Sequence, residues 1–239
     1  MDIRLILYYF FIALGASFSA VTGYYIGRKK GYEKKAIRVY IFLALVFGIF
    51  GSFFMGQIQN FIMSFTGLPY YISRMRIFGG LLFTPLLLFV PVRYLAGDFS
   101  EVSDIIAPGA YLILGFSKIG CAVYGCCYGI PWEYGVPSRF ENHLCFPVQL
   151  LESVLCFMLF GVMLYLVIKN KHRKGAAYPL TLILYGVVRF FVEFLRYYPE
   201  AERTYFFGMN LWQMFSVISA VAGLIWLMCN KYYGKNRDW

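Results

Sequence analysis

The segment Val39–Ser73 reads VYIFLALVFGIFGSFFMGQIQNFIMSFTGLPYYIS and contains no Asp, Glu, Lys or Arg. A helix needs about 20 apolar residues to cross a hydrocarbon core of roughly 30 Å, so this segment alone can span a bilayer. The whole chain of 239 residues is also rich in apolar residues, with 60% hydrophobic and 14% charged residues. Soluble domains contain about 45–50% apolar and about 25% charged residues. The composition therefore excludes a water-soluble globule and a disordered or fibrous protein, and it predicts a membrane protein.

Apolar stretches on both sides of this segment predict an all-α polytopic membrane protein with seven transmembrane helices. The predicted ranges are 5–26, 36–64, 78–96, 105–124, 148–169, 177–196 and 210–230. Some of these stretches reach a spanning length only if charged residues lie within the membrane. Those residues are Lys118, Glu152, Arg189 and Glu193. No repeat or soluble region is visible, so we expect residues 1–239 to form a single transmembrane domain.

The basic residues between the helices predict the orientation of the chain. A net charge of +10 would suggest nucleic-acid binding in a soluble protein. Here most Lys and Arg residues lie in the first and fifth linkers and in the C-terminal tail, which the positive-inside rule places in the cytoplasm. We therefore expect no nucleic-acid partner, an N-terminus outside and a C-terminus inside. The long irregular segments 65–77, 125–147 and 197–209 then face outward, and the functional site is expected there.

Helix 177–196 carries a polar stripe on an otherwise apolar segment. The stripe comprises Tyr185, Arg189, Glu193 and Arg196, which the helical period places on one face. A charge at mid-membrane costs about 2.5–3.5 kcal/mol and usually faces a cavity, a partner or a ligand. Arg189, roughly 10 Å inward from the outer end, could bind a lipid phosphate through two parallel hydrogen bonds. Alternatively, Arg189 and Glu193 pair with each other and only fasten helices together.

Two further helix starts supply candidates for the same outer site. Gln149 and Glu152 lie about one turn apart at the start of helix 148–169. Glu152 needs a cationic partner, for which the candidates are Arg189 and Lys118. Helix 78–96 begins with a glycine pair at positions 79 and 80. This pair favours either anion binding by backbone amides or close helix packing.

The stretch 120–129, GCAVYGCCYG, lies at the end of the fourth predicted helix. Because glycine is unfavourable within a helix, we expect a broken, partly re-entrant segment that lines a cavity. Its cysteines allow small apolar packing or a disulfide from Cys145 to Cys126 or Cys127, and these readings are favoured. A nucleophilic thiolate activated by Lys118 is the catalytic alternative. The spacing is not that of a metal site, so neither a metal nor another cofactor is expected.

Four motifs follow one another in the order found in a known family. The most specific is residues 185–196, YGVVRFFVEFLR, which has the form Tyr-Gly-x-x-Arg…Glu-Phe-x-Arg. The others are residues 147–152, PVQLLE; Asp104 with Ala107-Pro108; and residues 211–216, LWQMFS. In order and spacing, the chain resembles the prolipoprotein diacylglyceryl transferase family over nearly its full length.

Two motifs depart from the pattern of that family. The family's His-Gly-Gly-Leu is Phe78-Gly79-Gly80-Leu81 here. The family's signature Gly-Arg-x-Gly-Asn-Phe-x-Asn-Gly-Glu-x-x-Gly aligns, from its Arg onward, with residues 118–129. Lys118 stands for its Arg, Cys121 and Tyr124 for its two Asn, and Cys126 for its Glu. Candidates for a replacement base are His143, Tyr124, Tyr128 and the Cys126 thiolate.

The resemblance implies transfer of a diacylglyceryl group from phosphatidylglycerol to the lipobox cysteine of precursor lipoproteins, at the outer face of the bacterial plasma membrane. The residues expected to be catalytic are Arg189, Glu193, Lys118 and Tyr185. Those expected to bind substrate are Gly79, Gly80, Gln149, Glu152, Gly120, Cys121, Cys126 and Gly129. Two alternatives stay open: a catalytically impaired lipid-binding paralogue, and a related transferase with a different acceptor.

Overall fold

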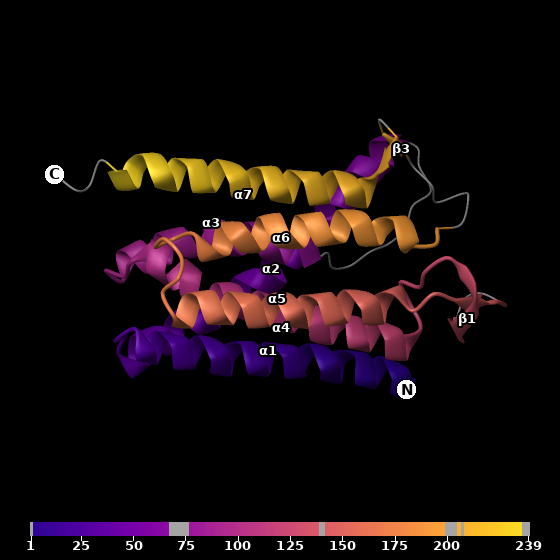
Figure 1. Ribbon diagram of the computed structural model, residues 1–239, viewed down its shortest axis with the longest axis horizontal. Helices are drawn as coiled ribbons and strands as arrows, with labels where there is room; N and C mark the ends of the chain where they lie inside the picture. The colour runs from indigo at the N-terminus through magenta and orange to yellow at the C-terminus, as the bar shows by residue number, and fades with distance from the viewer. Residues whose placement is uncertain (1, 67–76, 139–141, 199–204, 207, 236–239) are drawn as a thin grey trace.

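The computed structural model describes residues 2–66, 77–138, 142–198, 205–206 and 208–235, and these form a bundle of helices (Figure 1). The helices are α1 (Ile3–Lys29), α2 (Lys34–Thr66), α3 (Ile77–Tyr94), α4 (Phe99–Tyr124), α5 (Val148–Ile168), α6 (Ala177–Val192) and α7 (Leu211–Lys235). Each overlaps one predicted range. Among the described residues, six helices are long and apolar enough to cross a membrane, and α3 is a shorter apolar helix. The prediction of an all-α, multi-pass membrane protein is confirmed.

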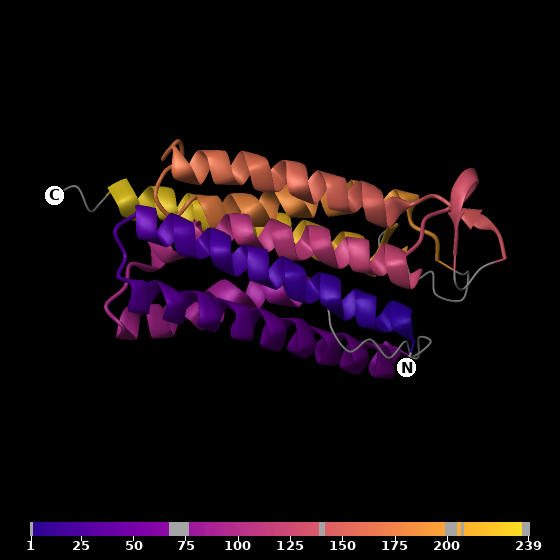
Figure 2. The same cartoon turned by 90° about the horizontal axis from the view of Figure 1, so that it is seen from below.

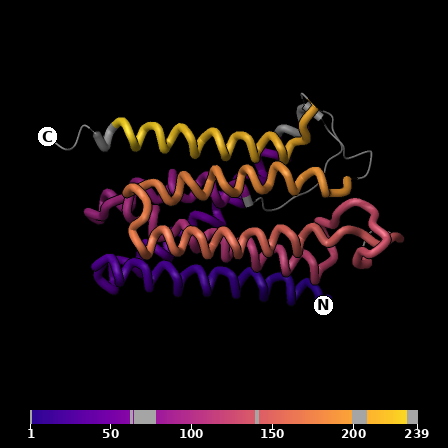
Figure 3. The backbone as a smooth tube through the Cα atoms, viewed as in Figure 1, coloured from indigo at the N-terminus to yellow at the C-terminus, as the bar shows by residue number. Residues whose placement is uncertain are grey.

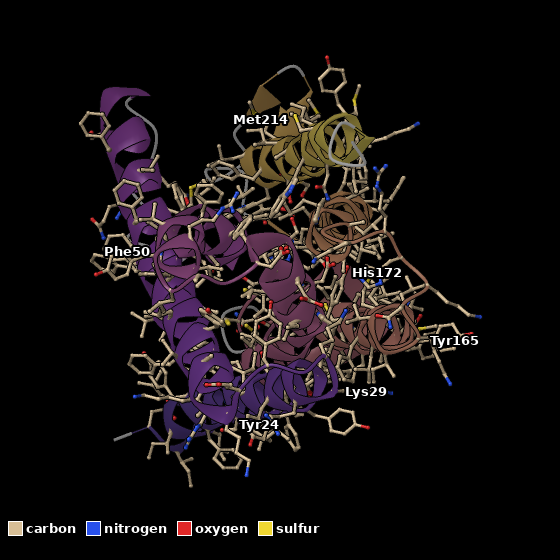
Figure 4. All side chains as sticks on the ribbon, turned by 90° about the vertical axis from the view of Figure 1, so that its left-hand side faces the viewer. Tyr24, Lys29, Phe50, Tyr165, His172 and Met214 are labelled. Carbon is tan, nitrogen blue, oxygen red and sulfur yellow. The ribbon has the colours of Figure 1, made fainter. Side chains whose placement is uncertain are left out.

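Helix α4 lies at the centre of the bundle, packed against α1 on one side and α5 on the other. Helices α2 and α3 pair with each other, as do α6 and α7. Figure 2 shows α5 and α2 on opposite sides of α1 and α4. In the view along the bundle, Phe50 lies on the outer side of α2 (Figure 4), where its side chain is exposed. Residues of α1, α2, α3 and α4, together with a few of α6 and α7, line one cavity in the bundle.

The two ends of the bundle differ in structure. At one end, here called the hairpin end, β1 (Pro131–Pro137) pairs antiparallel with β2 (Leu144–Cys145), and β3 (Tyr205–Phe206) pairs with β4 (Met209–Asn210). The N-terminus also lies there, and the C-terminus lies at the other end (Figure 3). The prediction of irregular structure over 125–147 missed these first two strands, although alternating aromatic and β-branched residues in β1 were an available signal. Most of segments 65–77 and 197–209 lies outside the described residues.

The end of α4 corrects the expectation of a broken segment. The helix continues through Gly120 and Cys121 to Tyr124, and Gly125, with a left-handed φ of 82°, ends it. Gly120 serves close packing instead, because a Cβ there would lie only 3.0 Å from the carbonyl oxygen of Tyr8 on α1. The irregular part of this stretch therefore begins only at Gly125.

Helix α4 also starts earlier than predicted, at Phe99, because Asp98 caps it. Asp104 is buried inside the helix and accepts backbone hydrogen bonds from Gly175 at 2.6 Å and Ala177 at 2.8 Å. Its Oδ2 also lies 3.0 Å from Nε2 of His172. These three donors satisfy the hydrogen-bonding capacity of the carboxylate, so Asp104 is tolerated inside the helix although its charge suggested a helix boundary. The same hydrogen bonds hold the linker between α5 and α6 against α4.

We expect His172 to make the stability of the protein depend on pH. Its ring nitrogens contact two acceptors, Asp104 Oδ2 and, at 3.1 Å, the carbonyl oxygen of Leu166. The hydrogen bond to Asp104 raises the pKa of His172. A raised folded-state pKa stabilises the protein below the unfolded-state value of about 6.5, and this contribution disappears as the pH rises through the folded-state value. Unfolding in detergent micelles should show lower stability at about pH 8 than at about pH 6, with a smaller difference in His172→Gln. Identical pH profiles would contradict this expectation.

Candidate functional site

Four of the predicted site residues form one buried polar network near the hairpin end. Glu152 on α5 is fully buried, and its Oε2 lies 2.9 Å from Nζ of Lys118 on α4. The same oxygen lies 3.6 Å from Nη1 of Arg189 on α6. Tyr185, one turn earlier on α6, donates a hydrogen bond of 3.0 Å to Oε1. The prediction that Glu152 has a cationic partner is confirmed, and both candidate cations contact it.

Glu193 extends this network beyond α6. The helix gives way to a 3₁₀ turn at Glu193–Leu195, and Oε2 of Glu193 lies 2.6 Å from Nη2 of Arg189. The other carboxylate oxygen accepts hydrogen bonds from the hydroxyl of Tyr198 and, at 3.1 Å, from the amide of Asn210. These last two residues could not be predicted from the sequence, because only the chain path after the turn brings them to Glu193.

Arg196 adds a third cation to the network. It follows the 3₁₀ turn, and its Nη2 donates a 3.4 Å hydrogen bond to the carbonyl oxygen of Cys127. Its Nε is buried and has no hydrogen-bond partner among the described residues. The charges gathered here comprise the cations Lys118, Arg189 and Arg196 and the carboxylates Glu152 and Glu193. Three cations and two carboxylates thus gather at this end of the bundle, with the sulfur of Cys127 near Arg196 as a further group that can carry negative charge.

A cavity of about 450 Å³ adjoins this cationic group. Lys118, Arg189 and Arg196 lie at one part of its wall. The rest is mainly apolar and comes mostly from α1, α2, α3 and α4, with Tyr178 of α6 and Trp212 of α7. Its apolar residues include Ile12, Ile41, Leu45, Ile49, Leu81 and Ile113. Its volume falls in the usual range of about 300–1,000 Å³ for small-molecule sites. A mainly apolar cavity that carries three cations suits an amphiphile with an anionic headgroup.

The predicted glycine pair lies between α2 and α3. A Cβ on Gly79 would overlap the carbonyl oxygen of Gly51, which is the close packing considered as one of the two readings. Gly80 lines the cavity, where a Cβ would lie 2.7 Å from Oγ of Ser52. The pair therefore brings α2 close to α3 and shapes the cavity wall beside the cationic group.

The remaining predicted residues hold the turn after α4 in place. Gln149 donates a 2.7 Å hydrogen bond to the carbonyl oxygen of Cys126. Gly129 donates to the carbonyl oxygen of Phe146 at 3.0 Å and forms an isolated β-bridge with Arg196. The turn is thus attached to the start of α5 and to the chain that follows α6. Gly120 lies apart from this group, at the contact of α4 with α1.

The cysteines are arranged differently from the expectation. Cys126 and Cys127 are not disulfide-bonded, so the predicted disulfide from Cys145 to either of them is absent. Instead, the sulfur atoms of Cys121, Cys126 and Cys127 lie within 4.8 Å of one another. Hydrogen bonds from Cys121 and Cys126, together with the nearby charges of Arg196 and Lys118, hold the pKa of Cys127 well below its usual range. Sequence spacing did not indicate this cluster, because the turn that forms it contains left-handed residues at Gly125 and Cys127.

Comparison with known proteins identifies the family of this chain. Residues 1–229 match the sequence model of the prolipoprotein diacylglyceryl transferase family. A phosphatidylglycerol-prolipoprotein diacylglyceryl transferase 2 of Clostridium perfringens is 31% identical over 144 residues, which cover 57% of this chain and 55% of that protein. The corresponding transferase of Clostridium tetani is 26% identical over 221 residues, 88% of each chain. That of Pasteurella multocida is 29% identical over 185 residues, covering 71% of this chain and 67% of the relative. The chain belongs to the prolipoprotein diacylglyceryl transferase family.

Proposed function

We propose that this protein transfers the diacylglyceryl group of phosphatidylglycerol to the lipobox cysteine thiol of prolipoproteins, at the outer face of the plasma membrane. The observation that carries the proposal is the mainly apolar cavity with Lys118, Arg189 and Arg196 in its wall. These features suit the acyl chains and the anionic phosphate of one phospholipid. The names of the relatives contain the two substrates.

The distribution of charge supports the proposed orientation. Basic residues in the linkers after α1 and α5 lie at the end of the bundle opposite the hairpin end. The positive-inside rule assigns that end to the cytoplasm. The hairpin end, with the N-terminus and the cationic group, then faces outward, and the C-terminus is cytoplasmic. A secreted precursor would meet the lipid at this outer end.

The reaction forms a carbon–sulfur bond between the acceptor thiol and the glyceryl carbon that carries the phosphate. The carbon–oxygen bond to the phosphate breaks, phosphoglycerol leaves with the electron pair, and the thiol proton passes to water or to the leaving phosphoglycerol. In this proposal Lys118, Arg189 and Arg196 bind the phosphate and stabilise the charge of the leaving group. Glu152 and Glu193 are positioning residues, because they hold two of the cations at 2.9 Å and 2.6 Å. Tyr185 positions Glu152 in turn.

Mass spectrometry of an acceptor peptide tests this function. The full chain is reconstituted in phosphatidylglycerol vesicles with a peptide that contains a lipobox cysteine. We expect the peptide to gain one diacylglyceryl group, and no gain with a Cys→Ser peptide or with phosphatidylcholine vesicles. Lipid binding without any modified peptide would overturn the transferase assignment. Modification of a residue other than the cysteine would identify a different acceptor and overturn the thiol specificity.

Filling the cavity should reduce transfer. Gly48 on α2 lines the cavity, and a Cβ there would meet just Oγ1 of Thr84, at 3.4 Å, within 4 Å. A leucine side chain at Gly48 would extend into the space proposed for lipid. This should weaken binding of the lipid in the transition state by about 1–3 kcal/mol, which corresponds to a decrease in the transfer rate of roughly tenfold or more. Gly161→Leu on α5 is the matched control, because a Cβ at Gly161 meets nothing within 4 Å. Equal transfer rates in Gly48→Leu and Gly161→Leu would contradict the assignment of the cavity.

A further inference from the structure

We propose that Cys121, Cys126 and Cys127 bind one thiophilic divalent cation of the zinc type, with an open coordination position for the acceptor thiol. The three sulfur atoms lie within 4.8 Å of one another, at the hairpin end of α4. Among the described residues no further His, Cys, Asp or Glu joins this group. Catalytic zinc sites have this number of protein ligands, three, and a fourth position for water or substrate.

The separation of the sulfur atoms fits such an ion after a small contraction. Zinc–sulfur bonds of about 2.3 Å at tetrahedral angles place the ligand sulfurs about 3.8 Å apart, so the cluster needs to close by about 1 Å. Two of the three residues belong to the turn after α4, where backbone adjustment is easier than within the helix. Each thiol that binds the cation releases one proton.

The backbone of the turn supports a specific role for this cluster. Cys127 has a φ of 61°, which is uncommon for a residue other than glycine, and it lies two residues after the left-handed Gly125. Such strain persists only where the surrounding structure maintains it, and it is concentrated at functional sites. Here Gln149 and Arg196 maintain it, through hydrogen bonds to the carbonyl oxygens of Cys126 and Cys127.

The open position would face the proposed reaction centre. Cys121 and Cys127 line the same cavity as Lys118 and Arg196, and Cys127 is exposed. An acceptor thiol that enters from the hairpin end can therefore reach the cation while the lipid phosphate lies against the basic side chains. This step rests on the proposed function.

Coordination would supply the thiolate that the transfer needs. A thiol bound to a divalent cation loses its proton outright. The released proton passes to water or to the departing phosphoglycerol. The bound sulfur then forms the bond to the glyceryl carbon, and the electron pair of the broken carbon–oxygen bond leaves with phosphoglycerol. The cation keeps its oxidation state, so no oxidant or reductant is required. This chemistry would compensate for Phe78, which stands where the family's motif has a histidine.

Metal content and cobalt substitution test the binding site in the full chain. The detergent-purified protein is loaded with Zn²⁺ or Co²⁺, and bound metal and thiolate-to-cobalt absorption are measured. We expect about one ion per chain and a loss of affinity of more than about tenfold in Cys127→Ser. Cys229→Ser, an exposed thiol on α7, should bind metal as the wild-type protein does. No bound ion, equal affinity in both variants, or a disulfide within the cluster by free-thiol titration would overturn the proposal.

A spectral measurement separates this proposal from the transferase assignment. A lipobox cysteine peptide should change the absorption spectrum of the bound cobalt, whereas the Cys→Ser peptide should not. An unchanged spectrum would overturn the open position. Undiminished transfer after removal of the metal would overturn the role of the cation while supporting the proposed function. Metal binding with the expected spectral change but no transfer would instead overturn the proposed function and support the thiol site.

Discussion

Glu152→Gln is expected to lower the free energy of unfolding by about 3–5 kcal/mol, because it removes the anion that two buried cations share. The side chain of Glu152 is fully buried, and those of Lys118 and Arg189 are 8% and 4% exposed. With a neutral glutamine at this position, the buried positive charges of Lys118 and Arg189 lose the negative charge that they share. The glutamine amide also has one oxygen and one NH2 group in place of two oxygens. The NH2 group must therefore lie either where an oxygen accepts the hydrogen bond from Tyr185 or where an oxygen contacts the two cations.

Unfolding in mixed detergent micelles measures this effect. The matched control is Glu133→Gln on β1, where the glutamate is exposed and the substitution should change stability by no more than about 0.5 kcal/mol. A Glu152→Gln protein as stable as this control would show that the buried charges do not depend on one another. The proposed positioning role of Glu152 would then be wrong as well.

Helix positions could be predicted from the sequence because each membrane-spanning helix needs a long apolar segment. Such segments are rare in soluble proteins. The errors occurred where a charge was treated as a boundary. Asp104 lies inside α4 because its carboxylate is satisfied by Gly175, Ala177 and His172, which are about 70 residues further along the chain. A local pattern contains no information on partners so distant in sequence. The helix therefore begins at Phe99, six residues before the predicted start.

The part of the candidate site that depends on local helical spacing could be predicted from the sequence. Helical spacing placed Arg189 beside Glu193, and the need to compensate a buried carboxylate indicated partners for Glu152. The thiol cluster could not be found in this way, since it depends on left-handed backbone at Gly125 and Cys127 that spacing alone does not specify. The cavity likewise arises from the way several helices pack, which periodicity does not determine.

Arg189→Ala is expected to reduce diacylglyceryl transfer by about 100-fold or more, the usual loss when a donor to transition-state charge is removed. Two interpretations of this residue make the same prediction for alanine. Arg189 lines the cavity, as a phosphate-binding residue should, and it also contacts the carboxylates of Glu152 and Glu193, as a residue that fastens helices should. Loss of activity through partial unfolding would follow from the second interpretation. Alanine alone therefore does not distinguish them.

Arg189→Lys distinguishes the two interpretations, because lysine keeps the positive charge but lacks the planar fork that binds phosphate through two hydrogen bonds. If Arg189 binds the lipid phosphate, transfer should fall at least about tenfold and the apparent KM for phosphatidylglycerol should rise, with stability close to wild type. If it only pairs with the two carboxylates, any loss of transfer should be accompanied by a loss of stability, because one ammonium replaces two separate guanidinium nitrogens. The matched control is Arg93→Lys, an exposed residue in the last turn of α3 at the opposite end of the bundle. Wild-type kinetics in Arg189→Lys would exclude the phosphate-binding role, whereas a raised KM at unchanged stability would separate lipid binding from helix packing.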